Sequence, residues 1–382
     1  FSHIVLRSVL DKYQYLSKQD RAFMTRLVDG TIEYMLQLDY IIDSFSKTKV
    51  RKMKPFIRNL LRMSVYQIKY MDAVPDSAVC NEAVKLAKRH KFAQLSGFVN
   101  GVLRNIARNI DSVQLDTLSI RYSMPQWIVD RFVAAYGEKK AEAIFKAFHS
   151  KSTISIRTNL TRCTPDELRA MLEAEGVTVT AVDELNYAFV ISGFDYLNGL
   201  QSFRDGLFYV QDISSMLVAQ TASPKKGDYV IDVCAAPGGK STHIAELLQG
   251  SGHVLARDLT DNKVDMIEEN IERHGLNNMS AEVWDATVPD ADSAGKADIL
   301  ICDLPCSGLG VLGRKKDIRY KMTPESVDEL ADLQRQILDT VHTYVKPNGV
   351  LVYSTCTIDE AENEDNVRWF IEKHPEFELD KS

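Results

Sequence analysis

The chain has 382 residues, of which 45% are hydrophobic and 26% are charged. This composition is typical of a folded globular protein and excludes a largely disordered chain. No apolar run reaches about 18 residues, so the sequence predicts no membrane-spanning helix.

The net charge of −7 is unevenly distributed along the chain. Residues 1–150 carry 24 Lys and Arg against 14 Asp and Glu, so the remainder of the chain is acidic. Between Lys47 and Arg108 there are 14 basic and three acidic residues. A basic segment on an acidic body favours a polyanionic partner such as RNA or DNA. A solvated helical surface would explain the same charge pattern equally well.

Six cysteines are spread over the chain without a C-x-x-C pair. This spacing predicts neither a structural zinc site nor a dense disulfide framework, so we expect no metal and a reducing, cytoplasmic environment. The cysteines are Cys80, Cys163, Cys234, Cys302, Cys306 and Cys356.

The first part of the chain shows helical periodicity. Residues 1–109 repeat apolar side chains at helical spacing, and Pro55 and Pro75 mark helix starts or breaks. We expect an all-α bundle over residues 1–120, followed by a connecting helix that begins at Pro125.

Residues 152–205 have a different pattern. Residues 153–157, 177–179 and 187–191 read as strands, and Thr164 caps a helix that follows the first strand. Together with the connecting helix, residues 121–205 therefore predict a small α+β subdomain, weakly similar to an RNA-recognition fold.

Residues 206–382 alternate strands with helices, which is typical of a Rossmann-like α/β domain with a doubly wound parallel sheet. We expect helices to begin near Lys240, Asp261, Thr323 and Glu360. The predicted strands are Tyr229–Val233, His253–Arg257, Ser280–Trp284, Asp298–Cys302 and Gly349–Tyr353.

The first of these strands is followed by a glycine-bearing loop and a helix, in the string from Asp232 to Thr242. A Walker loop would need glycine at position 234, which is Cys234, and a G-x-G-x-x-G fingerprint is absent. The remaining possibilities are an S-adenosylmethionine loop, in which the carboxylate and glycines hold the methionine end, and a plain turn. Asp258 and Asp285 end the next two strands, where carboxylates can bind ribose hydroxyls and an adenine amino group.

Two thiols follow the last two predicted strands, at Cys306 and Cys356. Parallel strands end at one edge of the sheet, so both thiols are expected beside the loop. A small buried hydrophobic role or a metal pair explains two such cysteines less well. A thiolate that adds to carbon 6 of cytosine lets carbon 5 attack a sulfonium methyl group, and Lys240 is the nearest candidate to stabilise that thiolate.

Three strings resemble the RNA cytosine-5 methyltransferases: Cys234 to Lys240, Asp303 to Gly308, and Ser354 to Thr357 followed by Glu362-Asn363-Glu364. The N-terminal part is similar to NusB-like domains in Asp20 to Phe23, Leu61 to Gln67, Asn81 to Lys88 and Phe98 to Arg104. The pairing of the two domains resembles the bacterial RsmB (Sun) family, which methylates cytosine in 16S ribosomal RNA.

This resemblance implies roles for individual residues. Cys356 would be the covalent nucleophile, Cys306 would assist product release, and Asp303 would lie between the cofactor and the target base. The residues implied to bind S-adenosylmethionine are Cys234, Ala235, Ala236, Pro237, Gly238, Gly239, Lys240, Asp258, Asp285 and Asp303.

The resemblance also implies a partner, 16S ribosomal RNA, either free or in a partly assembled small subunit. We expect Arg314, Lys315, Lys316, Arg319 and Lys321 to contact its phosphates; a solvated loop is the alternative. Other interpretations are cytosine-5 methylation of another RNA and a non-catalytic NusB-like RNA-binding factor. The chain ends before the final strand pair that we expect of this fold, so we expect a C-terminally truncated domain.

Overall fold

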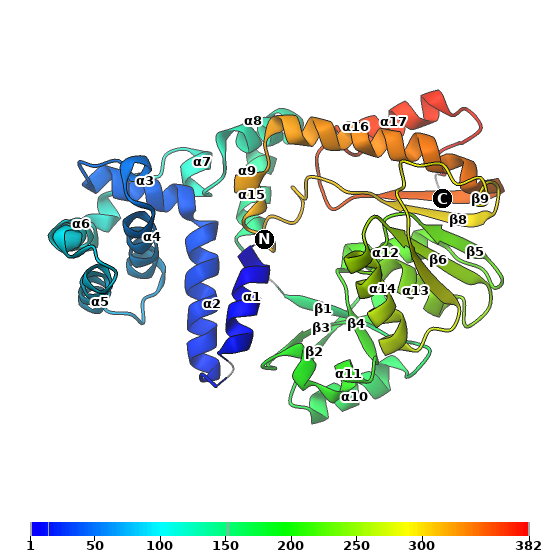
Figure 1. The fold of residues 1–382 in the computed structure, drawn as a ribbon, viewed down its shortest axis with the longest axis horizontal. Coiled ribbons are helices and arrows are strands. Elements are labelled where there is room, and N and C mark those ends of the chain that lie inside the picture. Colours follow the sequence, from blue (N-terminus) through cyan, green and yellow to red (C-terminus); the bar gives the residue numbers. More distant parts are fainter. Residues whose placement is uncertain (1, 14, 151–152, 381–382) are drawn as a thin grey trace. The chain divides into compact units, whose positions relative to one another are not determined.

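The computed structural model describes residues 2–13, 15–150 and 153–380 (Figure 1). It separates into two compact units. Unit 1 comprises residues 1–150 and 311–324, and unit 2 comprises residues 151–310 and 325–382. Neither boundary coincides with the expected limits at residues 120 and 205, because the helices up to residue 150 stay with unit 1 and a later segment joins them.

Unit 1 is built from α-helices, as the apolar periodicity predicts. Pro55 is the first residue of α4, and the Ser17 side chain caps α2 by accepting a hydrogen bond from the Asp20 amide. The helices are α1 (Ser2–Lys12), α2 (Lys18–Glu33), α3 (Met35–Phe45), α4 (Pro55–Tyr70), α5 (Asp76–Arg89), α6 (Ser96–Asn109), α7 (Leu118–Arg121), α8 (Gln126–Tyr136), α9 (Glu138–Phe148) and α15 (Ile318–Lys321).

The core of this bundle lies between α3, α4, α5 and α6. Each of these helices turns one apolar stripe inward, so that Leu38, Leu61, Ala83 and Leu103 are almost completely buried in one cluster. The expected all-α bundle is therefore confirmed.

The basic segment after Cys306 differs from the expected RNA clamp. Arg319 is 0% exposed, and its guanidinium donates hydrogen bonds to the carbonyls of Leu312 and Glu33 within unit 1. Lys316 pairs with the Glu33 carboxylate at 2.7 Å, and Lys321 pairs with Asp317 at 2.8 Å. The prediction was wrong for Arg319, because this side chain organises the interior of unit 1 and is shielded from any phosphate.

Unit 2 begins with a four-stranded antiparallel sheet in the order β2-β3-β1-β4. β4 was not expected in this sheet, because Phe208, which pairs with Thr158, lies beyond the expected boundary at residue 205. The strands are β1 (Ile154–Thr158), β2 (Thr178–Val182), β3 (Leu185–Ser192) and β4 (Phe208–Val210), with α10 (Pro165–Ala174) and α11 (Gln201–Arg204).

The two faces of this small sheet have different neighbours. Ile156 and Phe208 pack with Leu168 of α10, which begins with a capping box between Thr164 and Glu167. Because side chains alternate along a strand, Arg157 leaves the opposite face of β1.

The larger sheet of unit 2 has five parallel strands in the order β7-β6-β5-β8-β9. This confirms the expected doubly wound α/β domain. The strands are β5 (Tyr229–Asp232), β6 (His253–Asp258), β7 (Met279–Val283), β8 (Ala297–Asp303) and β9 (Val345–Ser354), and the helices are α12 (Ile213–Ala222), α13 (Gly239–Leu247), α14 (Asp261–His274), α16 (Pro324–Val341) and α17 (Glu364–Lys373).

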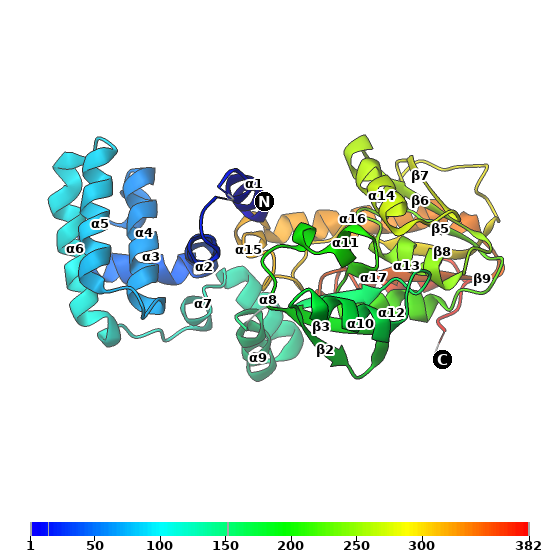
Figure 2. The ribbon, with the colours of Figure 1, turned by 90° about the horizontal axis from the view of Figure 1, so that it is seen from below.

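Helices cover both faces of the parallel sheet, which explains its nearly continuous apolar strands. In Figure 1 and Figure 2, α12, α13 and α14 lie on one side of the sheet, and α16 and α17 lie on the other. Val230 packs toward the first group of helices, and its neighbour Ile231 packs toward the second. The strand order reverses at β5, so the loop after β5 lies where α/β sheets bind ligands.

Two elements begin four residues away from the expected positions. The last helix begins at Glu364, four residues after the expected start at Glu360, because residues 360–363 form a turn in which the Asn363 amide bonds to the Glu360 carbonyl. β9 begins at Val345 and crosses Gly349 with a shift in its pairing to β8. Among the described residues, no helix combines the length and apolar character needed to cross a bilayer.

Candidate active site

The carboxyl ends of four adjacent strands carry most of the predicted site residues. The loop after β5 joins Asp258 at the end of β6, where the Ala236 amide donates to Asp258 Oδ2 at 2.9 Å. The loop also joins Asp303 at the end of β8, where Lys240 Nζ lies 2.5 Å from Asp303 Oδ2. Ser354, the last residue of β9, donates to Asp303 Oδ1 at 2.8 Å. The structure therefore brings the ends of β6, β5, β8 and β9 into one connected array.

Gly238 sets the path of the loop into α13. Its φ of +97° belongs to the left-handed region, which favours glycine, and it is the N-cap of α13. No side chain caps α13, all of whose residues are described, so the amides of its first turn are available to an anionic group.

Asp232, the last residue of β5, holds both ends of the loop by hydrogen bonds. Its carboxylate is 1% exposed, accepts from Ser241 Oγ at 2.5 Å, and accepts from the Cys234 amide at 3.4 Å. Burial raises the pKa of Asp232 to about 7, against the effect of these hydrogen bonds. Burial also raises the pKa of the Cys234 thiol, so Cys234 is a neutral lining residue.

Asp258, the last residue of β6, is held by three hydrogen bonds. Its carboxylate accepts from the amides of Ala236 and Leu259 and from Lys263 Nζ at 2.8 Å. An ionised carboxylate offers about four acceptor positions, so these three bonds leave capacity for one hydroxyl group.

The two predicted thiols lie against each other. Cys306 Sγ and Cys356 Sγ are 3.0 Å apart, and the Cys356 amide donates to Cys306 Sγ at 3.2 Å. Cys356 is exposed and Cys306 is half-buried. The hydrogen bond with Cys356, followed by burial, holds the pKa of Cys306 far above its usual range. Cys306 therefore keeps its proton and can donate it to a thiolate at Cys356.

Lys240 has a different partner from the expected one. Its ammonium group pairs with Asp303 and thereby ties the loop to β8. The sulfur of Cys356 is instead contacted by the thiol of Cys306. The prediction that Lys240 stabilises the thiolate directly is not supported by these contacts.

A buried polar layer, which the sequence analysis did not identify as part of the site, holds the two cysteine loops together. Glu362 is 0% exposed and accepts from the Ser307 amide at 2.8 Å, from Ser307 Oγ, and from Gln334 Nε2 at 3.0 Å. Ser307 Oγ also lies 3.0 Å from Thr357 Oγ1. Glu362 was visible in the sequence only as a member of the Glu362-Asn363-Glu364 string.

The Asp285 side chain bonds within its own turn. Its Oδ1 accepts from the amide and hydroxyl of Thr287, at 2.9 Å and 2.7 Å, which lowers the pKa of this exposed carboxyl. Its link to the array is through the backbone, where the Trp284 amide donates to the Asp258 carbonyl.

Among the described residues, one separate group could hold a metal ion: His342, His374 and Glu376, whose donor atoms lie within 4.8 Å of one another.

Comparison with known proteins places the chain in a family. The family model described as "16S rRNA methyltransferase RsmB/F" matches residues 219–382. The "NusB family" model matches residues 2–108, and a "Methyltr_RsmF/B-like, ferredoxin-like domain" model matches residues 124–194. A Bacillus subtilis protein named "Probable ribosomal RNA small subunit methyltransferase B" is 39% identical over all of this chain and 86% of its own length.

The chain belongs to the RsmB family of ribosomal RNA small subunit methyltransferases. The RsmB protein of Proteus mirabilis is 31% identical over 98% of this chain and 89% of its own. The resemblance drawn from the sequence motifs is thus confirmed.

Solved structures with a similar fold superpose on this RsmB protein. The crystal structure of PH0851 superposes with a TM-score of 0.85 at 25% identity, covering 98% of this chain and 86% of that one. NSun6 from Pyrococcus horikoshii, solved with SFG, superposes with a TM-score of 0.59 at 25% identity over 65% of this chain and 87% of that one. The three-part fold of an RsmB protein is therefore shown.

Proposed function

We propose that this protein methylates carbon 5 of a cytosine in 16S ribosomal RNA through a covalent bond between Cys356 and carbon 6 of the base. The observation that carries the proposal is the pair of thiols, 3.0 Å apart, at the ends of neighbouring strands. One methyl transfer needs a single nucleophile, and the second thiol suits the removal of a covalent product. The membership in a ribosomal RNA methyltransferase family supports the choice of substrate.

The cofactor of the proposed reaction is S-adenosylmethionine, which supplies an electrophilic methyl group. The uncapped N-terminus of α13 and the close turn at Gly238 suit its carboxylate, and Asp258 has acceptor capacity for its ribose. The residues that would hold it are Cys234, Ala235, Ala236, Pro237, Gly238, Gly239, Lys240, Asp258, Asp285 and Asp303.

The chain's own residues divide the work as follows. The thiolate of Cys356 forms a bond to carbon 6, which makes carbon 5 nucleophilic. Asp303, held by Lys240 and Ser354, would bond to the polar edge of the base. After methyl transfer, solvent takes the proton from carbon 5, the electrons of that C–H bond re-form the 5,6 double bond, and the bond from Cys356 to carbon 6 breaks. Cys306 assists this release by donating its proton to the departing thiolate of Cys356. Both thiols must stay reduced, which agrees with a cytoplasmic location.

The experiment is bisulfite sequencing of 16S ribosomal RNA incubated with the protein and S-adenosylmethionine. The proposal predicts one protected cytosine with the wild-type protein and none with Cys356→Ala. Transfer RNA in a parallel reaction tests the alternative substrate. Methyl incorporation without a protected cytosine, or equal protection by Cys356→Ala, would contradict the proposed chemistry.

A further inference from the structure

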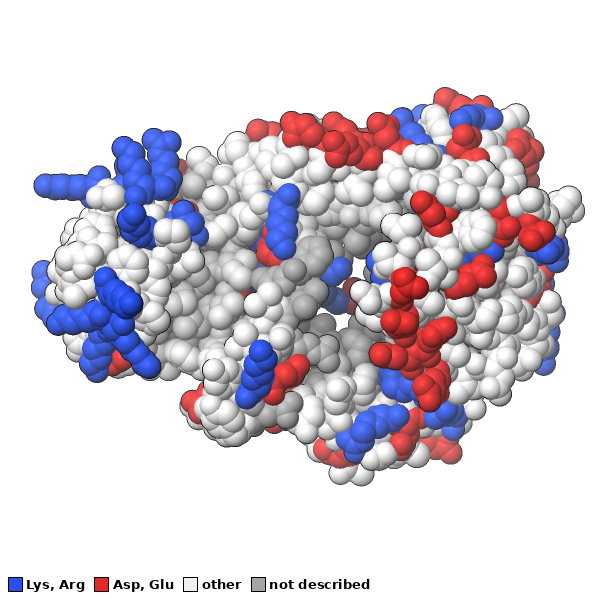
Figure 3. Space-filling view, in the orientation of Figure 1, with Lys and Arg blue, Asp and Glu red and all other residues white. Residues whose placement is uncertain are grey.

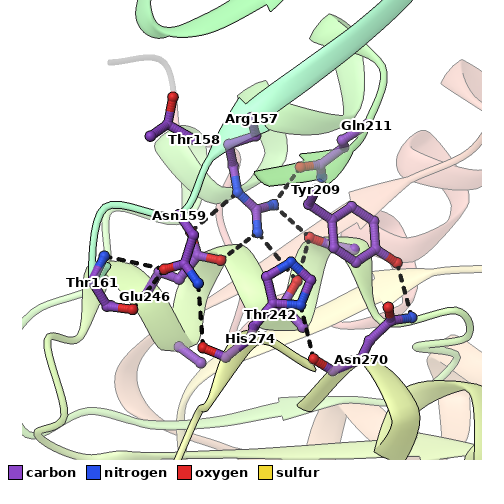
Figure 4. Close-up of polar contacts among 12 residues, drawn as sticks. Arg157, Thr158, Asn159, Thr161, Tyr209, Gln211, Thr242, Glu246, Asn270 and His274 are labelled. Atoms are coloured by element: carbon purple, nitrogen blue, oxygen red, sulfur yellow. Dashed lines mark hydrogen bonds and ion pairs between the residues drawn. The ribbon is translucent and has the colours of Figure 1, made fainter. Parts of the chain in front are cut away.

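One buried charged side chain of the small sheet in unit 2, that of Arg157, contacts the loop 234–240. Arg157 lies on β1 and is 1% exposed. Its side chain points away from the α10 side of the sheet and toward α13, where Figure 4 shows it between Gln211, Glu246 and Thr242. A buried guanidinium needs a partner for each of its donors, since an unpaired one carries a large desolvation cost.

The surroundings of Arg157 use all five of its N–H groups. Nε donates to Glu246 Oε2 at 3.2 Å, and Nη2 donates to Glu246 Oε1 at 2.7 Å and to Thr242 Oγ1 at 3.2 Å. Nη1 donates to Gln211 Oε1 and, at 2.9 Å, to the carbonyl of Gly239. Arginine alone among the side chains offers this planar set of five donors.

All of these partners except Gln211, which follows β4, lie on α13. Gly239 is the first residue of α13 and belongs to the loop, while Glu246 is near the last turn. Burial raises the pKa of the Glu246 carboxyl and the Arg157 charge opposes this shift. Arg157 thus ties the backbone of the loop to a buried carboxylate on the same helix.

A second side chain of the small sheet touches the same loop. Tyr209 on β4 donates its hydroxyl to the Pro237 carbonyl at 3.2 Å, and Asn270 of α14 donates to that carbonyl at 2.9 Å. The Tyr209 ring lies so close to Gly239 that a Cβ there would be 3.1 Å from ring atom Cε1. The Arg157 guanidinium lies 5.4 Å from the centre of the same ring.

We propose that Arg157 and Tyr209 are positioning residues for the cofactor, which hold the backbone of Pro237 and Gly239 in the conformation that S-adenosylmethionine binds. This inference rests on the proposed function only in its choice of cofactor. A loop that is already ordered loses less conformational freedom when the ligand binds, so its affinity is higher. The small sheet is then part of the cofactor site as well as a separate subdomain.

In the alternative, purely structural role, Arg157 and Tyr209 would only stabilise the packing of the small sheet against the rest of unit 2. Asn159, which follows β1, has such a structural role. It is fully buried and donates to the carbonyls of Gly206, at 2.9 Å, and His274, at 3.2 Å. It makes no hydrogen bond to the loop 234–240, all of whose residues are described, so Asn159→Ala is the matched control.

The test measures the affinity of the full-length protein for S-adenosylmethionine by calorimetry, together with KM and kcat. Arg157→Lys keeps the charge but loses two donors and the fork, and we expect about tenfold weaker binding. Tyr209→Phe removes one hydrogen bond, and we expect about fivefold weaker binding. In Tyr209→Phe the KM for S-adenosylmethionine rises while kcat at saturation stays within about twofold, as expected of lost uniform binding.

Asn159→Ala is expected to lower Tm and to bind S-adenosylmethionine with wild-type affinity. If Arg157→Lys does not fold, Tyr209→Phe alone decides the question. Wild-type affinity in Tyr209→Phe and in any folded Arg157→Lys overturns the inference, as does an equal loss of affinity in Asn159→Ala.

The measurement separates this inference from the proposed function, because calorimetry needs no RNA. A wild-type protein that binds S-adenosylmethionine but protects no cytosine from bisulfite overturns the proposed function alone. Normal cofactor affinity in the variants, with a protected cytosine in wild type, overturns the positioning role alone. A wild-type protein that does not bind S-adenosylmethionine overturns both.

Discussion

At the scale of single residues, ionising the buried carboxylate of Asp232 beside the loop lowers the stability of the folded protein. Its pKa is raised to about 7 by burial, whereas an exposed aspartate in the unfolded chain titrates near 3.8. Between these values the folded protein holds a proton that the unfolded chain has released, so stability falls as pH rises from about 4 to about 7. Above that window the full cost, up to about 4 kcal/mol, is present.

We therefore predict that Asp232→Asn gains stability relative to wild type as pH rises from about 4 to about 8. The free energy of unfolding of both proteins in urea, without cofactor, measures this change. The matched control is Asp298→Asn, because Lys346 and the Tyr229 amide lower the pKa of Asp298. Stability from Asp298 is present above about pH 4 and is lost below it, so the difference between Asp298→Asn and wild type stays constant between about pH 4 and about 8. A pH-independent difference for Asp232→Asn would contradict the assignment.

The residues of the site differ in how far the sequence predicts them. Cys306 and Cys356 follow predicted parallel strands, so their meeting at one edge could be expected from topology. Glu362 and Ser307 are 55 positions apart, and Arg157 and Glu246 are 89 apart. Their contacts depend on how loops and subdomains pack, which no local pattern encodes.

At the scale of elements, the turn into α13 depends on a backbone conformation that only glycine adopts easily. Gly238 has φ +97°, and Gly227, which precedes β5, has φ +92°. A Cβ at Gly238 would meet Ile267 at an ordinary 3.4 Å, and a Cβ at Gly227 would meet nothing within 4 Å. Alanine at either position is therefore strained chiefly by its backbone, at about 1–2 kcal/mol.

We predict that Gly238→Ala and Gly227→Ala lower the free energy of unfolding by similar amounts. Only Gly238→Ala is expected to weaken S-adenosylmethionine binding, because only this glycine lies in the loop. Urea unfolding and calorimetry of both variants supply the two readouts. Equal affinity in the two variants would argue against the loop as the cofactor site.

The element order of unit 2 could be predicted because strands and helices alternate with clear periodicity. The three-residue β4 was missed because Phe208–Val210 is too short to show alternation, and its pairing with β1 comes from tertiary contact. The segment 311–324 was misjudged for a related reason. Its charges indicate exposed contacts with RNA phosphates, whereas Lys316 pairs with the Glu33 carboxylate and the buried Arg319 donates to the Leu312 carbonyl.

At the scale of the whole molecule, the two units differ in the sign of their surface charge. Figure 3 shows Lys and Arg gathered over the part of unit 1 that contains α3 to α6, and Asp and Glu along α16 of unit 2. Arg51, Lys52 and Lys54 precede α4 and are exposed. Such a surface attracts RNA phosphates and releases counterions when it binds them.

Changing Arg51, Lys52 and Lys54 to Gln is predicted to weaken 16S ribosomal RNA binding without changing S-adenosylmethionine affinity. If all three contact phosphates, the slope of log affinity against log salt becomes shallower by about 2 to 3. Filter binding over a range of salt concentrations measures this slope. The control makes the same charge change in unit 2, at the exposed Lys225, Lys226 and Lys296. An equal effect of both triples would show that only net charge matters.

The central claim is that Cys356 becomes covalently bound to the target base and that Cys306 ends this bond. The most direct measurement is a denaturing gel of the protein after incubation with 16S ribosomal RNA and S-adenosylmethionine. Cys306→Ala should accumulate a slowly migrating protein–RNA adduct that ribonuclease removes, and Cys306→Ala combined with Cys356→Ala should show none. An adduct in the double variant, or its absence in Cys306→Ala that still binds RNA and cofactor, would contradict the account.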